Sequence, residues 1–155
     1  MRLSVILPVY NRMLLIRHSI QSLLDQTFTD FEIIAVDDYS DDSTWEVLNE
    51  LQKLDARIKP FRLKRHAGIT EAIKTAHEQA QGDICVKQDS DDLSLPNRLE
   101  VISAMFEKYP AMDFFYHSLY QTYTEDNDIL RRSFLKALPI EREKILKEQY
   151  IPGAY

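Results

Sequence analysis

Short apolar runs alternate with stretches of helical periodicity through the first hundred residues. The clearest runs cover residues 3–9 and 31–36, and weaker ones cover 58–63 and 83–87. Nearly continuous runs with β-branched residues are typical of strands that are buried on both faces of a parallel sheet. Pro60 lies within the third run, and proline cannot donate a ladder hydrogen bond, so we expect this strand at an edge or a bulge.

Apolar residues at helical spacing follow each run. They predict helices near residues 13–24, 44–54, 69–80 and 99–109. Ser43 and Glu46 have the spacing of a capping box for the second helix, Gly82 is a candidate C-terminal cap for the third, and Pro110 stops the fourth. This alternating order predicts an α/β fold, a Rossmann-type doubly wound sheet that is mostly parallel, with helices on both faces.

The last third of the chain has a different pattern. Residues 112–123 are rich in Phe and Tyr and predict a long strand, 125–128 predict a turn, and 131–149 predict an amphipathic segment. No repeat or linker divides the sequence. We therefore expect one domain over residues 1–155.

Composition narrows the class of protein. The chain has 155 residues, is 45% hydrophobic and has a net charge of -6, which disfavours a nucleic-acid-binding role. Its single cysteine, Cys85, cannot form an internal disulfide and is expected to be a small buried side chain. No apolar run approaches the roughly 20 residues of a membrane span. We expect a cytoplasmic protein, with a peripheral position at the inner face of the membrane as the alternative.

Carboxylates gather after two of the predicted strands. Ligands of open parallel sheets sit beyond the carboxyl ends of the strands, so these loops are the candidate site. After the fourth strand, Asp89 and Asp91 stand two positions apart and could point toward one Mg²⁺, Mn²⁺ or Ca²⁺ ion. Capping of the helix ahead of Pro96 is the alternative interpretation.

The other loops supply weaker candidates. Asp37 or Asp38 could accept hydrogen bonds from a base or ribose, and Tyr10 could stack on a nucleobase. Arg12 and the basic cluster 64–66 could contact phosphates. Rim packing for Tyr10 and solvation for the basic residues remain open as alternatives.

Four segments together resemble the family 2 glycosyltransferases, which have the GT-A fold. They are SVILPVYNR, QTFTDFE, VDDYSDDST and QDSDDLSLPNRLE, in the family's order and spacing over residues 1–110. The resemblance implies an enzyme that moves a sugar, mostly with inversion, from a nucleotide diphosphate donor to an acceptor. The donor is expected to be a UDP-sugar, and saccharide, lipid-linked and protein acceptors are all open.

The resemblance also implies roles for individual residues. Pro8 and Tyr10 would contact the nucleotide base, and Asp37 would bind its uracil-like edge. Asp89 and Asp91 would be the family's DXD pair for Mn²⁺ or Mg²⁺, with Ser90 between them in the donor site. The family's usual Arg-Asn pair is replaced here by Ile73-Lys74, and Lys74 would reach a phosphate or the sugar.

No general base for the acceptor hydroxyl is identified, because the resemblance ends where the acceptor-binding half of the family begins. We therefore expect a donor-binding domain that is truncated and weakly active or inactive alone. Such truncation would expose apolar surface and favour self-association. The alternatives are a noncatalytic nucleotide-sugar-binding module, a partner subunit of another glycosyltransferase, or, with a poor fit, a phospho-acceptor receiver domain.

Overall fold

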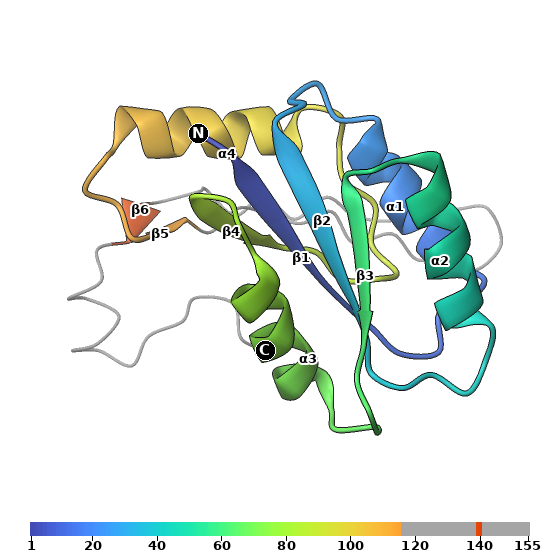
Figure 1. Ribbon diagram of the computed structural model, residues 1–155. Helices are drawn as coiled ribbons and strands as arrows, with labels where there is room; N and C mark the ends of the chain where they lie inside the picture. The colour runs from blue at the N-terminus through green and yellow to red at the C-terminus, as the bar shows by residue number, and fades with distance from the viewer. Residues whose placement is uncertain (116–138, 141–155) are drawn as a thin grey trace, which may run out of the picture. The chain divides into compact units, whose positions relative to one another are not determined.

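The computed structural model describes residues 1–115 and 139–140 (Figure 1). The chain divides into two compact units, Met1–Ser103 and Ala104–Tyr155, and each is described by itself. Within the described residues, no helix combines the length and apolar character that a membrane span requires. The expectation of a single domain over 1–155 stays a prediction.

A four-stranded parallel sheet forms the centre of the first unit. Its strands are β1 (Leu3–Val9), β2 (Phe31–Asp37), β3 (Ile58–Arg62) and β4 (Ile84–Lys87), in the order β3-β2-β1-β4. The four predicted strands and the parallel arrangement are confirmed. The strand that contains Pro60, β3, is an edge strand of the sheet, as expected. All four strands run in the same direction, so their carboxyl ends lie along the same end of the sheet, the lower one in Figure 1.

Four helices connect and follow the strands. They are α1 (Ile16–Leu24), α2 (Thr44–Leu54), α3 (Ile69–Gln79) and α4 (Arg98–Lys108). The chain steps outward from β1 to β2 to β3 and then crosses back past β1 to β4. Because such crossovers are right-handed, α1 and α2 cover one face of the sheet and α3 covers the other (Figure 1). The predicted doubly wound arrangement is confirmed.

The core follows from the two-sided burial of the central strands. Every residue of β1 and β2 is buried. On the α3 face, Ile6, Ile34 and Val36 pack against Ala72 and Ala76. The small alanine side chains let α3 lie close to the sheet, which explains why the third helix shows a weak apolar pattern in the sequence.

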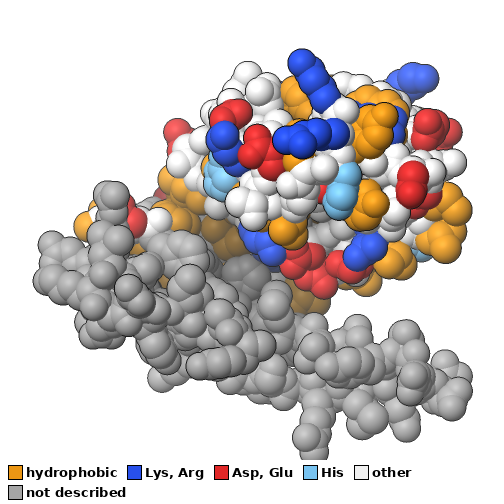
Figure 2. Space-filling model, turned by 90° about the horizontal axis from the view of Figure 1, so that it is seen from below, with side chains coloured by type: hydrophobic (Ala, Val, Ile, Leu, Met, Phe, Trp, Pro, Cys, Tyr) orange, Lys and Arg blue, Asp and Glu red, His pale blue; other side chains and the backbone are white. Residues whose placement is uncertain are grey.

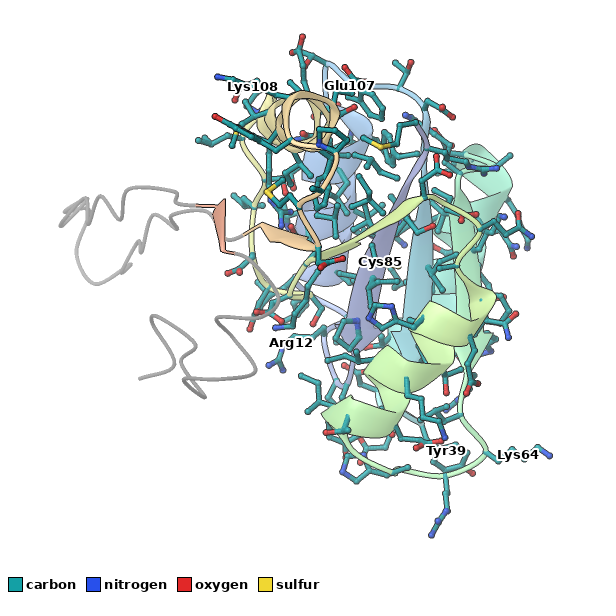
Figure 3. All side chains as sticks on the ribbon, turned by 90° about the vertical axis from the view of Figure 1, so that its left-hand side faces the viewer. Arg12, Tyr39, Lys64, Cys85, Glu107 and Lys108 are labelled. Carbon is teal, nitrogen blue, oxygen red and sulfur yellow. The ribbon has the colours of Figure 1, made fainter. Side chains whose placement is uncertain are left out.

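Three local predictions are wrong. Ser43 makes no capping hydrogen bond; the carboxylate of Asp42, one residue earlier, accepts the hydrogen bond from the backbone N–H of Thr44 at 2.9 Å. Gly82 lies beyond the cap of α3, and a Cβ there would stand 2.7 Å from Ser4 N, so close packing requires the glycine. Cys85 is exposed (Figure 3), because alternate residues of a strand face opposite sides and β4 buries Val86.

The second unit contains a short antiparallel pair. Strand β5 (Phe114–Phe115) pairs with β6 (Pro139–Ile140), with Phe114 opposite Ile140. Within the predicted strand 112–123, the described part that forms a strand is Phe114–Phe115, so the strand starts two residues later than expected. Its remainder, the predicted turn 125–128 and most of the amphipathic segment 131–149 fall outside the described residues.

Candidate functional site

A cleft of about 360 Å³ opens at the edge where the strands end. It is built from the loops after β1, β2, β3 and β4 and from the start of α3. Its lining residues are Pro8, Val9, Tyr10, Arg12, Asp38, His66, Ile69, Ala72, Asp89, Ser90 and Asp91. Figure 2, which views the molecule from this side, shows acidic and basic side chains interspersed over the face. This is the edge at which open α/β sheets bind their ligands.

Hydrogen bonds fix the loop after β1 to the loop after β2. Asn11 adopts the left-handed conformation with φ 50°, which Asn tolerates better than most residues. Its side-chain Oδ1 accepts the N–H of Asp41 at 3.1 Å, and its own N–H donates to Ser40 Oγ at 3.0 Å. The N–H of Arg12 donates to Thr44 Oγ1 at 2.8 Å. These contacts hold Tyr10 and Arg12 in place on the cleft wall.

Tyr10 and His66 form an aromatic stack in the cleft. Their ring centroids are 4.2 Å apart and the planes are inclined by 25°. His66 Nδ1 also lies 2.9 Å from Asp38 Oδ2, and the His66 side chain is 55% exposed. With a proton on Nδ1, the imidazole is thus a flat ring that stacks on a tyrosine and donates an N–H to a carboxylate.

The two aspartates after β2 have different surroundings. Asp37 is fully buried: its Oδ1 accepts hydrogen bonds from the N–H and hydroxyl of Ser40, and Arg62 Nε lies 3.1 Å from its Oδ2. Asp38 lines the cleft and accepts the N–H groups of Ala67 and Gly68 at 2.7 and 2.8 Å. Asp37 therefore anchors the end of β2, and Asp38 is the carboxylate that faces the cleft.

Gly68 allows the backbone to bring the N–H groups of Ala67 and Gly68 to Asp38. Its φ of +91° lies in the region that side chains with a Cβ rarely adopt. This conformation allows the loop after β3 to direct two successive N–H groups at one carboxylate just before α3 begins.

The loop after β4 brings two further carboxylates, Asp89 and Asp91, to the cleft. Asp89 Oδ1 lies 2.7 Å from Lys87 Nζ, and Asp91 Oδ2 lies 3.4 Å from Arg12 Nη2. Burial, followed by the charges of Asp89 and Asp91, raises the pKa of the neighbouring Asp92. The loop carries repulsion between carboxylates that a bound cation would relieve.

The buried side chain of Gln88 holds this loop in shape. Its Nε2 donates to the carbonyl oxygens of Asp89 and Asp92 at 3.2 and 2.8 Å. Its Oε1 accepts hydrogen bonds from Ser94 Oγ at 2.8 Å and Arg98 Nη1 at 2.6 Å. Gln88 is 4% exposed, so it connects both ends of the acidic loop from inside the protein.

The donor set fits a hard divalent cation whose coordination the protein completes only in part. In the portion of the chain that is described, no group of three His, Cys, Asp or Glu side chains is arranged to hold a metal ion. Mg²⁺ usually keeps several waters and is bound by one or two carboxylates together with substrate phosphates. Asp89 and Asp91, which both line the cleft, would provide the carboxylates for that kind of binding.

Most of the predicted site residues come together in this cleft. Pro8, Tyr10, Asp89, Ser90 and Asp91 line it, whereas Asp37 and Lys74 do not. Lys74 is 64% exposed on α3, and its Nζ lies 3.8 Å from Glu71 Oε1, one turn away.

Asp38 and His66 are the cleft residues to which sequence reasoning gave too little weight. The signal that was available is Gly68, because a glycine that opens a helix after a basic loop indicates a backbone cradle for a neighbouring acceptor.

Comparisons with known proteins identify the family and the fold. The sequence model of the family described as "Glycosyl transferase family 2" matches residues 4–153. A Campylobacter jejuni enzyme named GalNAc(5)-diNAcBac-PP-undecaprenol beta-1,3-glucosyltransferase is 38% identical over 102 residues, which cover 65% of this chain and 33% of that protein.

Two solved structures have the same fold. TarS 1–349 of S. aureus in complex with UDP-GlcNAc is 25% identical with a TM-score of 0.70, over 86% of this chain and 38% of that one. The mannosyltransferase PcManGT of Pyrobaculum calidifontis, in complex with GDP-Man and Mn²⁺, is 23% identical with a TM-score of 0.67, over 77% and 36%. The chain spans less than half the length of the curated relatives it matches. With the family match over nearly all of its sequence and the GT-A fold of its structural neighbours, the chain belongs to glycosyltransferase family 2.

Proposed function

We propose that this chain binds the nucleotide diphosphate part of a sugar donor, a UDP-sugar, through Mn²⁺ or Mg²⁺ at Asp89 and Asp91. The observation that carries the proposal is the cleft itself. It brings an aromatic ring, a hydrogen-bond acceptor and a pair of carboxylates to the edge of one sheet. The aromatic ring would stack on a base, and the acceptor would bind a ribose hydroxyl or a base N–H. The pair of carboxylates would hold the metal ion of a metal-bound diphosphate.

The proposal also assigns each part of the donor to a group of the cleft. Tyr10 would stack on the base. Asp38 would accept a base N–H, because it lines the cleft and Asp37 does not. The diphosphate would extend toward the loop after β4, where a cation between Asp89 and Asp91 would neutralise it. A bare diphosphate would be repelled by these carboxylates, so we expect donor binding to require the metal.

When bound, the cation would stabilise the negative charge that develops on the departing nucleotide. The activity of the whole protein would then be inverting sugar transfer. The acceptor hydroxyl needs a general base, and we assign none to the described residues. We therefore expect these 155 residues to bind the donor and to transfer little or no sugar on their own.

Calorimetric titration tests the proposal. UDP, GDP and their sugars are titrated into the chain with Mn²⁺ and again with excess chelator. We expect UDP to bind with metal only, and Asp91→Asn to abolish this binding. The matched control is Asp30→Asn, which removes one exposed carboxylate outside the cleft.

Four other results would each lead to a different conclusion. Equal binding with and without chelator would contradict the metal site, and loss in the Asp30 variant would show a general charge effect. Binding without turnover, even when a longer chain is supplied, would favour the noncatalytic module. A folded chain that binds none of these nucleotides would overturn the proposal.

A further inference from the structure

Arg12 stands out from the other charged groups of the cleft. Three carboxylates line the cleft: Asp38, Asp89 and Asp91. Among the described lining residues, Arg12 is the one whose positive charge does not depend on pH, since His66 is charged only when protonated. Of the lining residues that the structure describes, Arg12 is therefore the permanent cation that a polyanionic donor meets, whereas Lys87 contacts Asp89 from outside the lining.

Hydrogen bonds hold both the backbone and the side chain of Arg12 in place. Its N–H is fixed by Thr44 Oγ1, and its Nη1 donates to the carbonyl oxygens of Asn11 at 3.1 Å and Tyr10 at 3.3 Å. The remaining terminal nitrogen, Nη2, lies 3.4 Å from Asp91 Oδ2. In Figure 3 the Arg12 side chain lies near the edge at which the strands end. One side of the guanidinium is thus anchored to the loop after β1, and the other reaches the proposed metal ligand.

The contact with Asp91 is suited to exchange. Both side chains are partly exposed, at 40% and 45%, and exposed ion pairs contribute little stability because water screens them. Arg12 Nε is buried and has no hydrogen-bond acceptor among the described residues. The guanidinium therefore has an unused donor and a weak partner, so a strong acceptor such as a phosphate would improve its interactions.

From these contacts we propose that Arg12 is a phosphate-binding residue that is held on Asp91 until a divalent cation takes its place. The cation displaces the guanidinium from Asp91, and the released guanidinium binds the diphosphate of the donor. The inference rests on the proposed function and adds a role for a residue next to the metal pair. It means that the metal prepares the site twice, by its own charge and by releasing Arg12.

The exchange predicts opposite effects of one substitution on two ligands. In Arg12→Gln, Asp91 has no competing cation, so Mn²⁺ alone binds about two- to fivefold tighter, the range expected for an exposed ion pair. UDP at saturating Mn²⁺ binds about tenfold weaker or more, because a charge-assisted hydrogen bond to phosphate is lost. Uridine, which has no phosphate, binds unchanged.

The measurements use the full chain and two further variants. Free Mn²⁺ is followed by electron paramagnetic resonance during titration, and UDP and uridine are titrated by calorimetry. Arg12→Lys keeps the charge and should retain part of the UDP affinity. Arg65→Gln is the matched control, because Arg65 is an exposed arginine of the loop after β3 that does not line the cleft. Circular dichroism establishes that each variant is folded.

The other outcomes distinguish failure of the inference from failure of the proposed function. Unchanged binding of both ligands would make Arg12–Asp91 a solvated surface pair. Weaker binding of both would show that Arg12 only orders Asp91. If the parent chain binds Mn²⁺ but no nucleotide, the proposed function fails, and the metal titration still decides whether Arg12 competes for Asp91. If the parent chain binds neither, both proposals fail.

Discussion

His66 occupies the position on Tyr10 that a nucleobase would need. The imidazole stacks on the tyrosine ring and lies 2.9 Å from the acceptor Asp38, so it satisfies the same two groups that a base with a ring N–H would satisfy. Such a ring must move before the base can enter. His66→Ala is therefore expected to tighten uridine binding about threefold, in line with the loss of one competing stack and one hydrogen bond. Calorimetry with uridine measures this effect without the metal or the phosphates.

The exposed His77 of α3 provides the control for this substitution, since it lies outside the cleft. His77→Ala should leave uridine affinity unchanged. Weaker binding in His66→Ala would show instead that the imidazole forms a wall for the base.

The two neighbouring aspartates should separate stability from binding. Asp37→Asn removes a fully buried charge paired with Arg62 and Ser40, and we expect a loss of about 3–5 kcal/mol of unfolding free energy. Asp38 is also buried but lines the cleft, and Asp38→Asn leaves one oxygen for the N–H groups of Ala67 and Gly68. This variant should therefore weaken uridine binding in addition to losing stability, whereas Asp37→Asn should lose stability alone. Urea unfolding and calorimetry of both variants measure the two effects. If Asp37→Asn weakened binding without destabilising the protein, the assignment of the cleft carboxylate would be reversed.

At the scale of the element, the acidic loop depends on the buried Gln88. Replacement by Leu keeps the approximate volume of the side chain. It removes the hydrogen bonds to the carbonyls of Asp89 and Asp92 and to Ser94. We expect a loss of about 1–3 kcal/mol of unfolding free energy. We also expect weaker Mn²⁺ binding, because the loop that carries Asp89 and Asp91 is no longer held in shape. The metal titration gives the binding effect and urea unfolding gives the stability. Full retention of Mn²⁺ affinity would show that the loop keeps its shape without this residue.

The strands were predictable from sequence because burial on both faces imposes apolar runs, and the loops that follow them had to share one edge. Details that depend on which atoms meet across the fold were not predictable. The choice between Asp37 and Asp38 depends on long-range contacts with Arg62 and Gly68. Gly68 marks a turn in the sequence, but the sequence does not show which aspartate its N–H meets. The role of Gln88 depends on Arg98, ten residues away. At the start of α2, Asp42 rather than Ser43 accepts the capping hydrogen bond, which also depends on atomic positions that the sequence pattern does not give.

Strand β2 also contains a buried carboxylate far from the cleft. Burial opposes ionisation of Glu32, but hydrogen bonds from Lys59, Ser4 and the N–H of Gln81 outweigh it and lower its pKa to about 2. Because the folded-state pKa lies below the ordinary value of 4.5, protonation favours the unfolded chain. This carboxylate should contribute on the order of 3 kcal/mol above pH 4.5, a contribution lost as pH falls toward 2.

Urea unfolding as a function of pH measures this contribution. Glu32→Gln should flatten the dependence of stability on pH over that window. Glu71→Gln, which removes a half-exposed carboxylate of α3, should not. Equal slopes in the parent chain and in Glu32→Gln would contradict the assignment.

At the scale of the whole molecule, charge makes the metal a condition for binding. The chain carries a net charge of -6, and three of its carboxylates line the cleft, so the field around the site repels a diphosphate. A ligand that binds only the folded state stabilises it by mass action, by about 2.7 kcal/mol at a hundredfold excess over the dissociation constant. For a chain of this size that corresponds to a rise of roughly 5–10 °C in Tm.

Thermal unfolding followed by circular dichroism should show this rise with UDP and Mn²⁺ together. UDP with chelator should give little or no rise, because the acidic cleft then faces an uncompensated polyanion. Asp91→Asn should lose the rise in Tm that UDP and Mn²⁺ give together, whereas Asp30→Asn should keep it.

Raising the salt concentration separates repulsion by the whole acidic chain from the need for direct bonds between the metal and the cleft carboxylates. If salt restores binding of metal-free UDP, the long-range field of the acidic chain is the main barrier, since salt screens exposed charges beyond about 10 Å. If salt has no such effect, the metal is required for its direct bonds to Asp89 and Asp91.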